Sequence, residues 1–384
     1  MLRSWTEGRR RLLLIAVSSV VSLGLAEAGI RIFSPVPAPI LDDAADTPLS
    51  ALLFETSLFA RFVLPARAHD IRLPSGIHYH INAYGYRGTD FKWEKPEGTT
   101  RILVYGGSSV FDIHASGEEH WPKRLQRSLV ERGHVGVEVI NAGIPGHASF
   151  DCVGRLLAEG HLLSPDFVLL YGAWNDVKSF QFEKPLLRTM KPYRPREDWL
   201  RRPSGPLDAG VARVSHLYRL ARFAWFSRGQ RVGPEGLVPR RRGSARFTGS
   251  LQAGQLRQFE IDVGTFVDLA RNAGAVPILV TEARLVAPDN SESDRKKIAY
   301  GYVHLSHEEL LAAFGAADDI LEDVARTKRA MLIDASVRLT GRRGLFVDQV
   351  HLSPDGSGEL AALLADSLSP ILAARGPSGR TDAR

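Results

Sequence analysis

The stretch ILVYGGSSVFD, residues 102–112, runs from four apolar residues directly into two glycines and two serines. A short apolar run of this kind is typical of a buried strand. The small residues that follow it form either a plain turn or a loop that holds a nucleophilic hydroxyl at the carboxyl end of the strand. The rest of the chain decides between these two interpretations.

Short apolar runs recur along the chain, and helical patterns separate them. The predicted strands are 101–105, 137–142, 167–173, 276–282 and 330–336. The predicted helices are approximately 120–132, 149–162, 251–273, 304–327 and 354–374. Buried strands that alternate with amphipathic helices predict a parallel sheet covered on both faces, with right-handed connections. We therefore expect a doubly wound three-layer α/β/α sandwich around a mainly parallel five-stranded sheet.

Residues 1–33 predict an N-terminal apolar helix that acts as an export signal or a membrane anchor. Three arginines at positions 9–11 precede an uncharged run over 12–26. This order is typical of both kinds of segment. The run is shorter than the roughly 17–25 residues of a span, and the AEA stretch ending at Ala28 resembles a cleavage site. A signal peptide cleaved near Ala28 and an anchor helix that continues to about Phe33 therefore both stay open.

The remaining chain divides by composition. Residues 34–100 begin as a stalk rich in Pro and Ala and continue as short strands that we expect to pack on the domain. The main domain is predicted over 101–376, followed by a disordered tail over 377–384. An insertion over 178–250 interrupts the strand and helix alternation, and a helix is predicted within it at 216–226. The insertion carries 17 Lys or Arg against 5 Asp or Glu.

The basic insertion suggests an anionic partner. A solvated surface is the simplest interpretation. The two functional alternatives are contact with anionic lipid headgroups and contact with an acidic polysaccharide. No nucleic-acid-binding module accompanies the arginines, and an exported domain would rarely meet nucleic acid, so we expect no nucleic-acid partner. Cys152 is the single cysteine, which excludes an intramolecular disulfide.

Polar motifs follow the predicted strands at equivalent places. They are GGSS at 106–109, NAGIPG at 141–146, GAWND at 172–176 and, before the last helix, DQVH at 348–351. The carboxyl ends of parallel strands meet at one edge of a sheet, and ligands bind there. Each motif alone is a weak signal. Together, and in this order, they predict one site.

The residue types in these motifs fit nucleophilic catalysis. The Ser108 hydroxyl needs a base to take its proton, and His351 can be that base. Asp348 can accept the other ring N–H and fix the tautomer of the imidazole. The oxyanion that forms needs donors, and the candidates are the backbone N–H groups of Ser108 and Gly146 and the side-chain amide of Asn175. No metal or organic cofactor is needed for this chemistry.

These four stretches resemble the SGNH hydrolases, also called the GDSL esterase/lipase family, over roughly residues 100–374. The resemblance implies a flavodoxin-like sandwich of the SGNH type and a serine hydrolase that acts on ester bonds. It places the nucleophile at Ser108, the second-block glycine at Gly146, the third-block asparagine at Asn175, and the last-block pair at Asp348 and His351. The chain departs from the family at position 107, where glycine replaces aspartate, and Ser109 leaves the choice of nucleophile open to test.

Two further stretches resemble membrane-anchored members of that family, namely NAYGYRG at 82–88 and AEAGIRIF at 26–33. They favour a retained anchor in a bacterial inner membrane, with the catalytic domain on the periplasmic side. The alternative is a secreted or periplasmic protein after cleavage near Ala28. Three other histidines, His114, His120 and His147, lie near the predicted site in the sequence, and the sequence assigns them no role.

The predicted function is hydrolysis of an acyl or acetyl ester, with a carbohydrate of the cell envelope or a secreted glycan as the expected substrate. Location and family habit suggest the carbohydrate, and no residue specifies it. A polysaccharide O-acyltransferase that uses the same site is one alternative. A glycan-binding scaffold that keeps the fold without catalysis is the other.

Overall fold

The computed structural model describes residues 2–33, 52, 54–55, 57–73, 75–183, 206–227 and 250–375. The chain forms two units, one of residues 1–45 and 194–243 and the other of residues 46–193 and 244–384. The predicted tail at 377–384, much of the predicted stalk and the flanks of the basic insertion lie outside the described residues.

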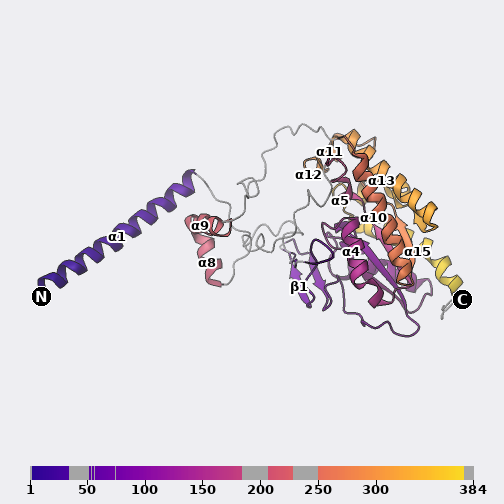
Figure 1. The fold of residues 1–384 in the computed structure, drawn as a ribbon, viewed down its shortest axis with the longest axis horizontal. Helices are drawn as coiled ribbons and strands as arrows, with labels where there is room; N and C mark the ends of the chain where they lie inside the picture. The colour runs from indigo at the N-terminus through magenta and orange to yellow at the C-terminus, as the bar shows by residue number, and fades with distance from the viewer. Residues whose placement is uncertain are drawn as a thin grey trace. The chain divides into compact units, whose positions relative to one another are not determined.

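Five parallel strands form the sheet of the second unit (Figure 1). They are β3 (Thr100–Gly106), β4 (Val137–Asn141), β5 (Phe167–Tyr171), β6 (Val276–Val280) and β7 (Met331–Ile333). Their order in the sheet is β4-β3-β5-β6-β7, and every neighbouring pair is parallel. The predicted five-stranded parallel sheet is confirmed, and each strand lies where an apolar run predicts one.

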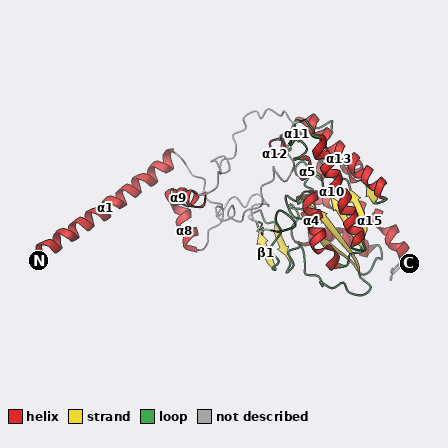
Figure 2. Cartoon of the chain, in the orientation of Figure 1, coloured by secondary structure: helices red, strands yellow, loops and turns green. Residues whose placement is uncertain are grey.

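Helices cover both faces of this sheet (Figure 2, helices in red and strands in yellow). The long helices are α3 (Trp121–Glu131), α4 (Ser149–Glu159), α10 (Ala253–Asn272), α13 (His307–Lys328) and α15 (Pro354–Arg375). Side chains alternate along β3, so Ile102 and Val104 pack with α3 and α15 on one face. Leu103 and Tyr105 pack with α4, α10 and α13 on the other face. The predicted three-layer sandwich is therefore confirmed.

Shorter helices lie in the loops between these elements. They are α2 (Ser108–Phe111), α5 (Trp174–Val177), α11 (Glu292–Arg295), α12 (Tyr300–Val303), α14 (Ala335–Leu339) and the 3-10 turns η3 (Gly117–Glu119), η4 (Gly160–Leu163) and η6 (Arg343–Leu345). Both α2 and α5 follow a strand of the sheet directly, at its carboxyl end. They therefore begin at the edge where ligands bind in open parallel sheets.

An antiparallel hairpin precedes the sheet, as the sequence predicts for 67–100. It consists of β1 (His69–Arg72) and β2 (His78–Ile81). Tyr79 and Ile81 are fully buried in a cluster that contains Phe111 at the end of α2. The hairpin therefore packs beneath the first loop at the carboxyl edge of the sheet.

The first unit contains α1 (Leu2–Phe33), α8 (Pro206–Val214) and α9 (His216–Ser227). Within α1, residues Leu14–Ile32 are long and apolar enough to cross a membrane, and none of that stretch is buried. A signal sequence would satisfy the same criteria of length and composition. The helix predicted at 216–226 inside the basic insertion is confirmed as α9.

Candidate active site

Ser108 is the first residue of α2 and follows β3 after a single glycine. Its side chain is nearly buried, with 6% of the residue exposed. The strand ends at Gly106, and the turn into α2 presents the serine hydroxyl at the carboxyl edge of the sheet. The stretch that opens the sequence analysis is therefore a strand, a short turn and a helix start.

His351 and Asp348 lie in the loop before α15 and complete a chain of hydrogen bonds with Ser108. His351 Nδ1 lies 2.6 Å from Asp348 Oδ2, and His351 Nε2 lies 2.7 Å from Ser108 Oγ. An ionised carboxylate accepts only, so the ring N–H at Nδ1 donates to Asp348 and leaves Nε2 to accept from the serine hydroxyl. This tautomer is the one that a general base needs.

Asp348 is held in the ionised form. Burial alone would raise the pKa of its carboxyl group, but the hydrogen bond and charge of His351 outweigh that effect and lower it below its usual value. Its Oδ1 also accepts from the backbone N–H groups of Val350 and His351, at 3.1 and 2.9 Å. These bonds fix the carboxylate relative to the imidazole before any substrate arrives.

The neighbouring hydroxyl of Ser109 is committed elsewhere. Ser109 Oγ donates to Glu282 Oε1 at 2.7 Å, and its backbone carbonyl accepts from Trp121 Nε1 at 2.8 Å. Ser108, in contrast, faces His351. The two adjacent serines therefore have different partners, and only Ser108 lies beside a base.

The start of α5 and the loop after β4, which carry two of the predicted oxyanion donors, meet beside Gly107. Asn175, in α5 after β5, donates from its amide to the carbonyl oxygen of His147 at 2.8 Å. His147 follows Gly146 in the loop after β4. The Asn175 amide has a second N–H, and among the described residues the backbone N–H groups of Ser108 and Gly146 donate to no other protein group. In the described part of the chain, each predicted donor therefore keeps an N–H group that no protein acceptor uses.

Two glycines allow this close approach. Gly146 has φ +88°, a left-handed conformation that glycine adopts without strain. A Cβ at Gly107 would lie 2.6 Å from Asn175 Nδ2 and 2.9 Å from the His147 carbonyl oxygen. Both contacts are too short to persist, so a side chain at 107 would displace the asparagine. This gives a physical reason for glycine where the resembled family has aspartate.

No protein-family profile and no curated protein matches this chain. Solved structures with a similar fold include TesA, at 16% identity and a TM-score of 0.42, covering 71% of this chain and 99% of that chain. They also include a catalytic mutant of Axe2, an acetylxylan esterase from Geobacillus stearothermophilus, at 14% identity and a TM-score of 0.42, covering 71% of this chain and 96% of that one.

A putative lipolytic protein of the G-D-S-L family from Desulfitobacterium hafniense is a third similar structure. Its identity is 12% and its TM-score 0.39, with 70% of this chain and 99% of that chain covered.

Glu282 is a site residue that the sequence analysis did not identify. It follows β6 and is almost fully buried, at 1% exposed. Its Oε2 accepts from the backbone N–H groups of Ala173 and Trp174 at 2.8 and 2.7 Å, and its Oε1 accepts from Ser109. One carboxylate therefore ties the start of α2 to the start of α5. A signal existed, because an acidic residue ends the run VPILVTE at the same edge of the sheet.

Asp176 links the start of α5, which carries Asn175, to the start of α4, which follows the loop that carries Gly146. Its carboxylate accepts from the backbone N–H of Ser149 at 3.1 Å and from the Ser149 hydroxyl at 2.6 Å, at the start of α4. Asp176 is buried, and burial raises its pKa to about 7 despite these hydrogen bonds. This link joins the loop that carries Asn175 to the loop that carries Gly146.

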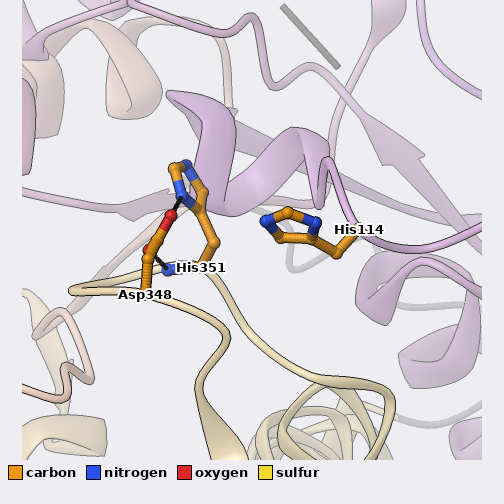
Figure 3. Close-up of side chains that lie close together, drawn as sticks. All are labelled: His114, Asp348 and His351. Atoms are coloured by element: carbon orange, nitrogen blue, oxygen red, sulfur yellow. Dashed lines mark hydrogen bonds and ion pairs between the residues drawn. The ribbon is translucent and has the colours of Figure 1, made fainter. Parts of the chain in front are cut away.

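His114 lies beside the imidazole of His351, and Figure 3 shows the two rings with Asp348. The ring centroids are 5.7 Å apart and nearly perpendicular. Burial, together with the neighbouring His351, lowers the pKa of His114. His114, Asp348 and His351 are near enough to suggest a metal site. Both ring nitrogens of His351 already lie in hydrogen bonds, however, so a metal would have to disrupt the bonds to Ser108 and Asp348.

The other two unassigned histidines, His120 and His147, hydrogen-bond to backbone groups outside the catalytic set. His120 precedes α3, and its Nδ1 accepts from the backbone N–H of Lys123 as a helix cap. His147 Nε2 lies 2.7 Å from the carbonyl oxygen of Phe62. Neither side chain hydrogen-bonds to Ser108, His351 or Asp348, so neither belongs to the predicted catalytic set.

Proposed function

We propose that this protein is a serine hydrolase that cleaves carboxylic esters, with Ser108 as the nucleophile. The observation that carries the proposal is the continuous hydrogen-bonded chain from Ser108 Oγ through His351 to Asp348. A base within hydrogen-bond distance of a hydroxyl, itself oriented by a third group, is the geometric signature of an activated serine. Ser108 and His351 are buried and Asp348 is partly buried, which strengthens these interactions relative to water.

The reaction follows from these contacts. Ser108 Oγ attacks the ester carbonyl carbon while its proton moves to His351 Nε2, and Asp348 stabilises the imidazolium. The N–H groups of Ser108, Gly146 and Asn175 bind the oxyanion. His351 then gives its proton to the leaving alcohol as the acyl–oxygen bond breaks. Water, deprotonated by His351, attacks the acyl-serine and releases the acid.

For the substrate we propose an acylated or acetylated carbohydrate. Tyr302 of α12 supports this class, because the residue is 42% exposed and its hydroxyl donates to Asn175 Oδ1 at 3.4 Å. The Tyr302 ring stacks on Trp174, and the Lys178 ammonium lies 3.8 Å from its centre. The partly exposed hydroxyl and ammonium therefore offer polar groups beside Asn175 to which sugar hydroxyls could hydrogen-bond. Transfer to a glycan hydroxyl in place of water would use the same acyl-serine, and the product of the reaction distinguishes the two.

We also propose that α1 remains in the mature protein as a membrane anchor, with the esterase unit on the exported side. The supporting observations are the length and apolar surface of Leu14–Ile32 and the basic residues before it. This places the substrate in the cell envelope or outside the cell.

The test is ester hydrolysis by the purified full-length chain, measured with 4-nitrophenyl acetate and as acetate released from an acetylated glycan. Ser108→Ala should lower kcat/KM by at least about 10³-fold. Asn175→Ala should lower kcat by about 10²–10³-fold through loss of one oxyanion donor. Ser367→Ala, whose hydroxyl donates only to its own helix at Leu363, is the matched control. Undiminished hydrolysis by Ser108→Ala would contradict the proposal.

A further inference from the structure

The hairpin of helices α8 and α9 is attached to α1 at a charged residue near the end of the candidate span. Glu27 accepts from the hydroxyl of Ser215 at 2.9 Å, and from the backbone N–H groups of His216 and Leu217 at 2.7 and 2.8 Å. It therefore caps the N-terminus of α9, where backbone donors lack partners within the helix.

Arg31 completes this attachment. Its Nε donates to Glu27 Oε1 at 2.8 Å, and its Nη2 donates to the carbonyl oxygen of Val214, the last residue of α8. The corner between α8 and α9 is thus held on α1 from both sides, by an acid at the start of one helix and a base at the end of the other. We call this contact the Glu27 clamp.

The clamp fixes the depth of the hairpin relative to α1. Glu27 lies five residues before Ile32, the last residue of the candidate span, which is about 8 Å along a helix. A carboxylate is costly in hydrocarbon unless donors satisfy it, and the clamp supplies donors to both of its oxygens. In a bilayer spanned by Leu14–Ile32, the start of α9 would therefore lie close to the level where α1 leaves the hydrocarbon.

One face of α8 is apolar and uncovered. Leu207, Val211 and Val214 are 85%, 43% and 65% exposed, and their spacing of four and three residues places them on one side of the helix. The other side packs on α9, where Ala212 is buried and Tyr218 donates to Asp208 at 2.9 Å. We call Leu207, Val211 and Val214 the apolar stripe.

We propose that the α8–α9 hairpin lies on the bilayer surface where α1 emerges, with the apolar stripe in the headgroup boundary. In this arrangement the Glu27 clamp sets the depth of the hairpin. Short amphipathic helices with an apolar face bind membranes in this way. The basic composition of the insertion, with 17 Lys or Arg in residues 178–250, complements anionic headgroups. The inference depends on the proposed anchor and not on the proposed esterase reaction.

The test uses the full-length chain in vesicles that contain phosphatidylglycerol, with one environment-sensitive fluorophore on an introduced cysteine. Cys152, the single native cysteine, is buried and is replaced by alanine. The reporter is Val211→Cys. Val20→Cys in α1 reports the lipid, and Val337→Cys, 78% exposed in the second unit, reports water. Quenching by iodide is compared with quenching by a lipid that carries a nitroxide near its headgroup.

We expect the fluorophore at position 211 to lose most of its iodide quenching, as at position 20. We expect the headgroup nitroxide to quench it more strongly than at position 20, which lies deeper in the bilayer. If iodide quenches the fluorophore at position 211 as strongly as at position 337, while the fluorophore at position 20 still reports lipid, the inference is overturned and the anchor stays intact. Protection at 211 from both quenchers would also overturn it, because protein and not lipid would cover the stripe. If the fluorophore at position 20 also reports water, the proposed anchor is wrong and the inference that depends on it is wrong as well.

The clamp is tested in the same system. Glu27→Ala should return iodide quenching to position 211 while position 20 stays in lipid, and Ser215→Ala should do so to a smaller extent. A hairpin that stays on the bilayer in both variants would show that the clamp does not hold it. Because no arm measures ester hydrolysis, failure of the hairpin inference and failure of the esterase proposal are distinguishable.

Discussion

At the scale of single residues, two adjacent serines differ in their hydrogen-bond partners. Ser108 faces an imidazole at 2.7 Å, while Ser109 donates to a buried carboxylate at 2.7 Å. That carboxylate, Glu282, also accepts from two backbone N–H groups at the start of the helix that carries Asn175. We infer that Glu282 positions the nucleophile and an oxyanion donor relative to each other without touching the substrate.

We predict that Glu282→Ala lowers kcat by about 10–100-fold and changes KM little, because a small misplacement of catalytic groups reduces reactivity more than binding. Ser109→Ala removes one of the three hydrogen bonds to Glu282 and should have a smaller effect. Glu282→Gln keeps an acceptor oxygen and should recover part of the activity. The measurement is steady-state kinetics on a soluble ester, with thermal unfolding of each variant. A folded Glu282→Ala protein with normal kcat would exclude the positioning role.

At the scale of elements, the segment before the sheet supports the loop after the nucleophile. Arg87 is buried and donates to the carbonyl oxygens of Phe111, the last residue of α2, and of Asp112 and Ala115 in the loop after it. Its guanidinium also lies 4.8 Å from the ring centre of Tyr79 in the hairpin. Burial lowers the pKa of Arg87 to about 10, so the group remains charged at neutral pH.

We predict that Arg87→Ala lowers the free energy of unfolding by about 3–5 kcal/mol, because three carbonyl groups lose their donor in a buried site. Arg87→Lys should recover only part of this loss, since an ammonium cannot reach three acceptors in the guanidinium geometry. Arg72→Ala, at an exposed position on β1, should stay within about 0.5 kcal/mol of the parent. Urea unfolding measures all three. Equal stability of Arg87→Ala and Arg72→Ala would contradict this account.

The link between α5 and α4 predicts a dependence of stability on pH. Burial raises the pKa of Asp176 from 3.8 to about 7 in the folded protein. Between these values the folded state binds the proton more tightly than the unfolded state, so this group makes the protein less stable as the pH rises from 4 to 7. A difference of this size corresponds to at most about 4 kcal/mol.

We predict that Asp176→Asn removes this component. Its free energy of unfolding, relative to that of the parent, should increase as the pH rises from 4 to 7, because only the parent loses stability through Asp176. Asp289→Asn, at an exposed position before α11, is the control and should follow the parent. Denaturant titrations at several pH values measure the differences. Parallel curves for the parent and Asp176→Asn would show that Asp176 titrates normally.

At the scale of the whole molecule, the chain separates into a unit that contains the long apolar helix and a unit that contains the sheet. Within the first unit, Glu27 and Arg31 bond to residues almost two hundred positions later in the chain. A signal peptidase cut near Ala28 would remove Glu27 from this contact. The contact therefore favours retention of α1 in the mature protein.

We predict that the protein stays with the membrane fraction at high salt, is extracted by detergent, and has an intact mass that includes residues preceding Ala28. The reason is the uncovered apolar surface of Leu14–Ile32. The measurement is intact mass spectrometry after detergent extraction, with Glu27→Ala compared. A soluble species that begins close to Ala28 would contradict the retained anchor.

The sequence predicted the sheet and its long helices well, because continuous apolar runs and amphipathic periods are local signals. It also indicated Ser108, His351 and Asp348, because each lies next to a strand end or a helix start. It did not identify Glu282, since a single acidic residue after a strand acquires meaning only when the fold brings it to Ser109 and Ala173. The roles of Arg87 and of the Glu27 clamp depend on distant partners in the same way, and no local pattern predicts them.

The central claim is that the Ser108 hydroxyl, and not its neighbour, is the activated nucleophile. The most direct measurement is labelling of the folded full-length protein with a fluorophosphonate, followed by peptide mapping of the adduct. We predict a single adduct on Ser108, formed by the parent and lost in His351→Ala. An adduct on Ser109, or no adduct on protein shown to be folded, would contradict the account.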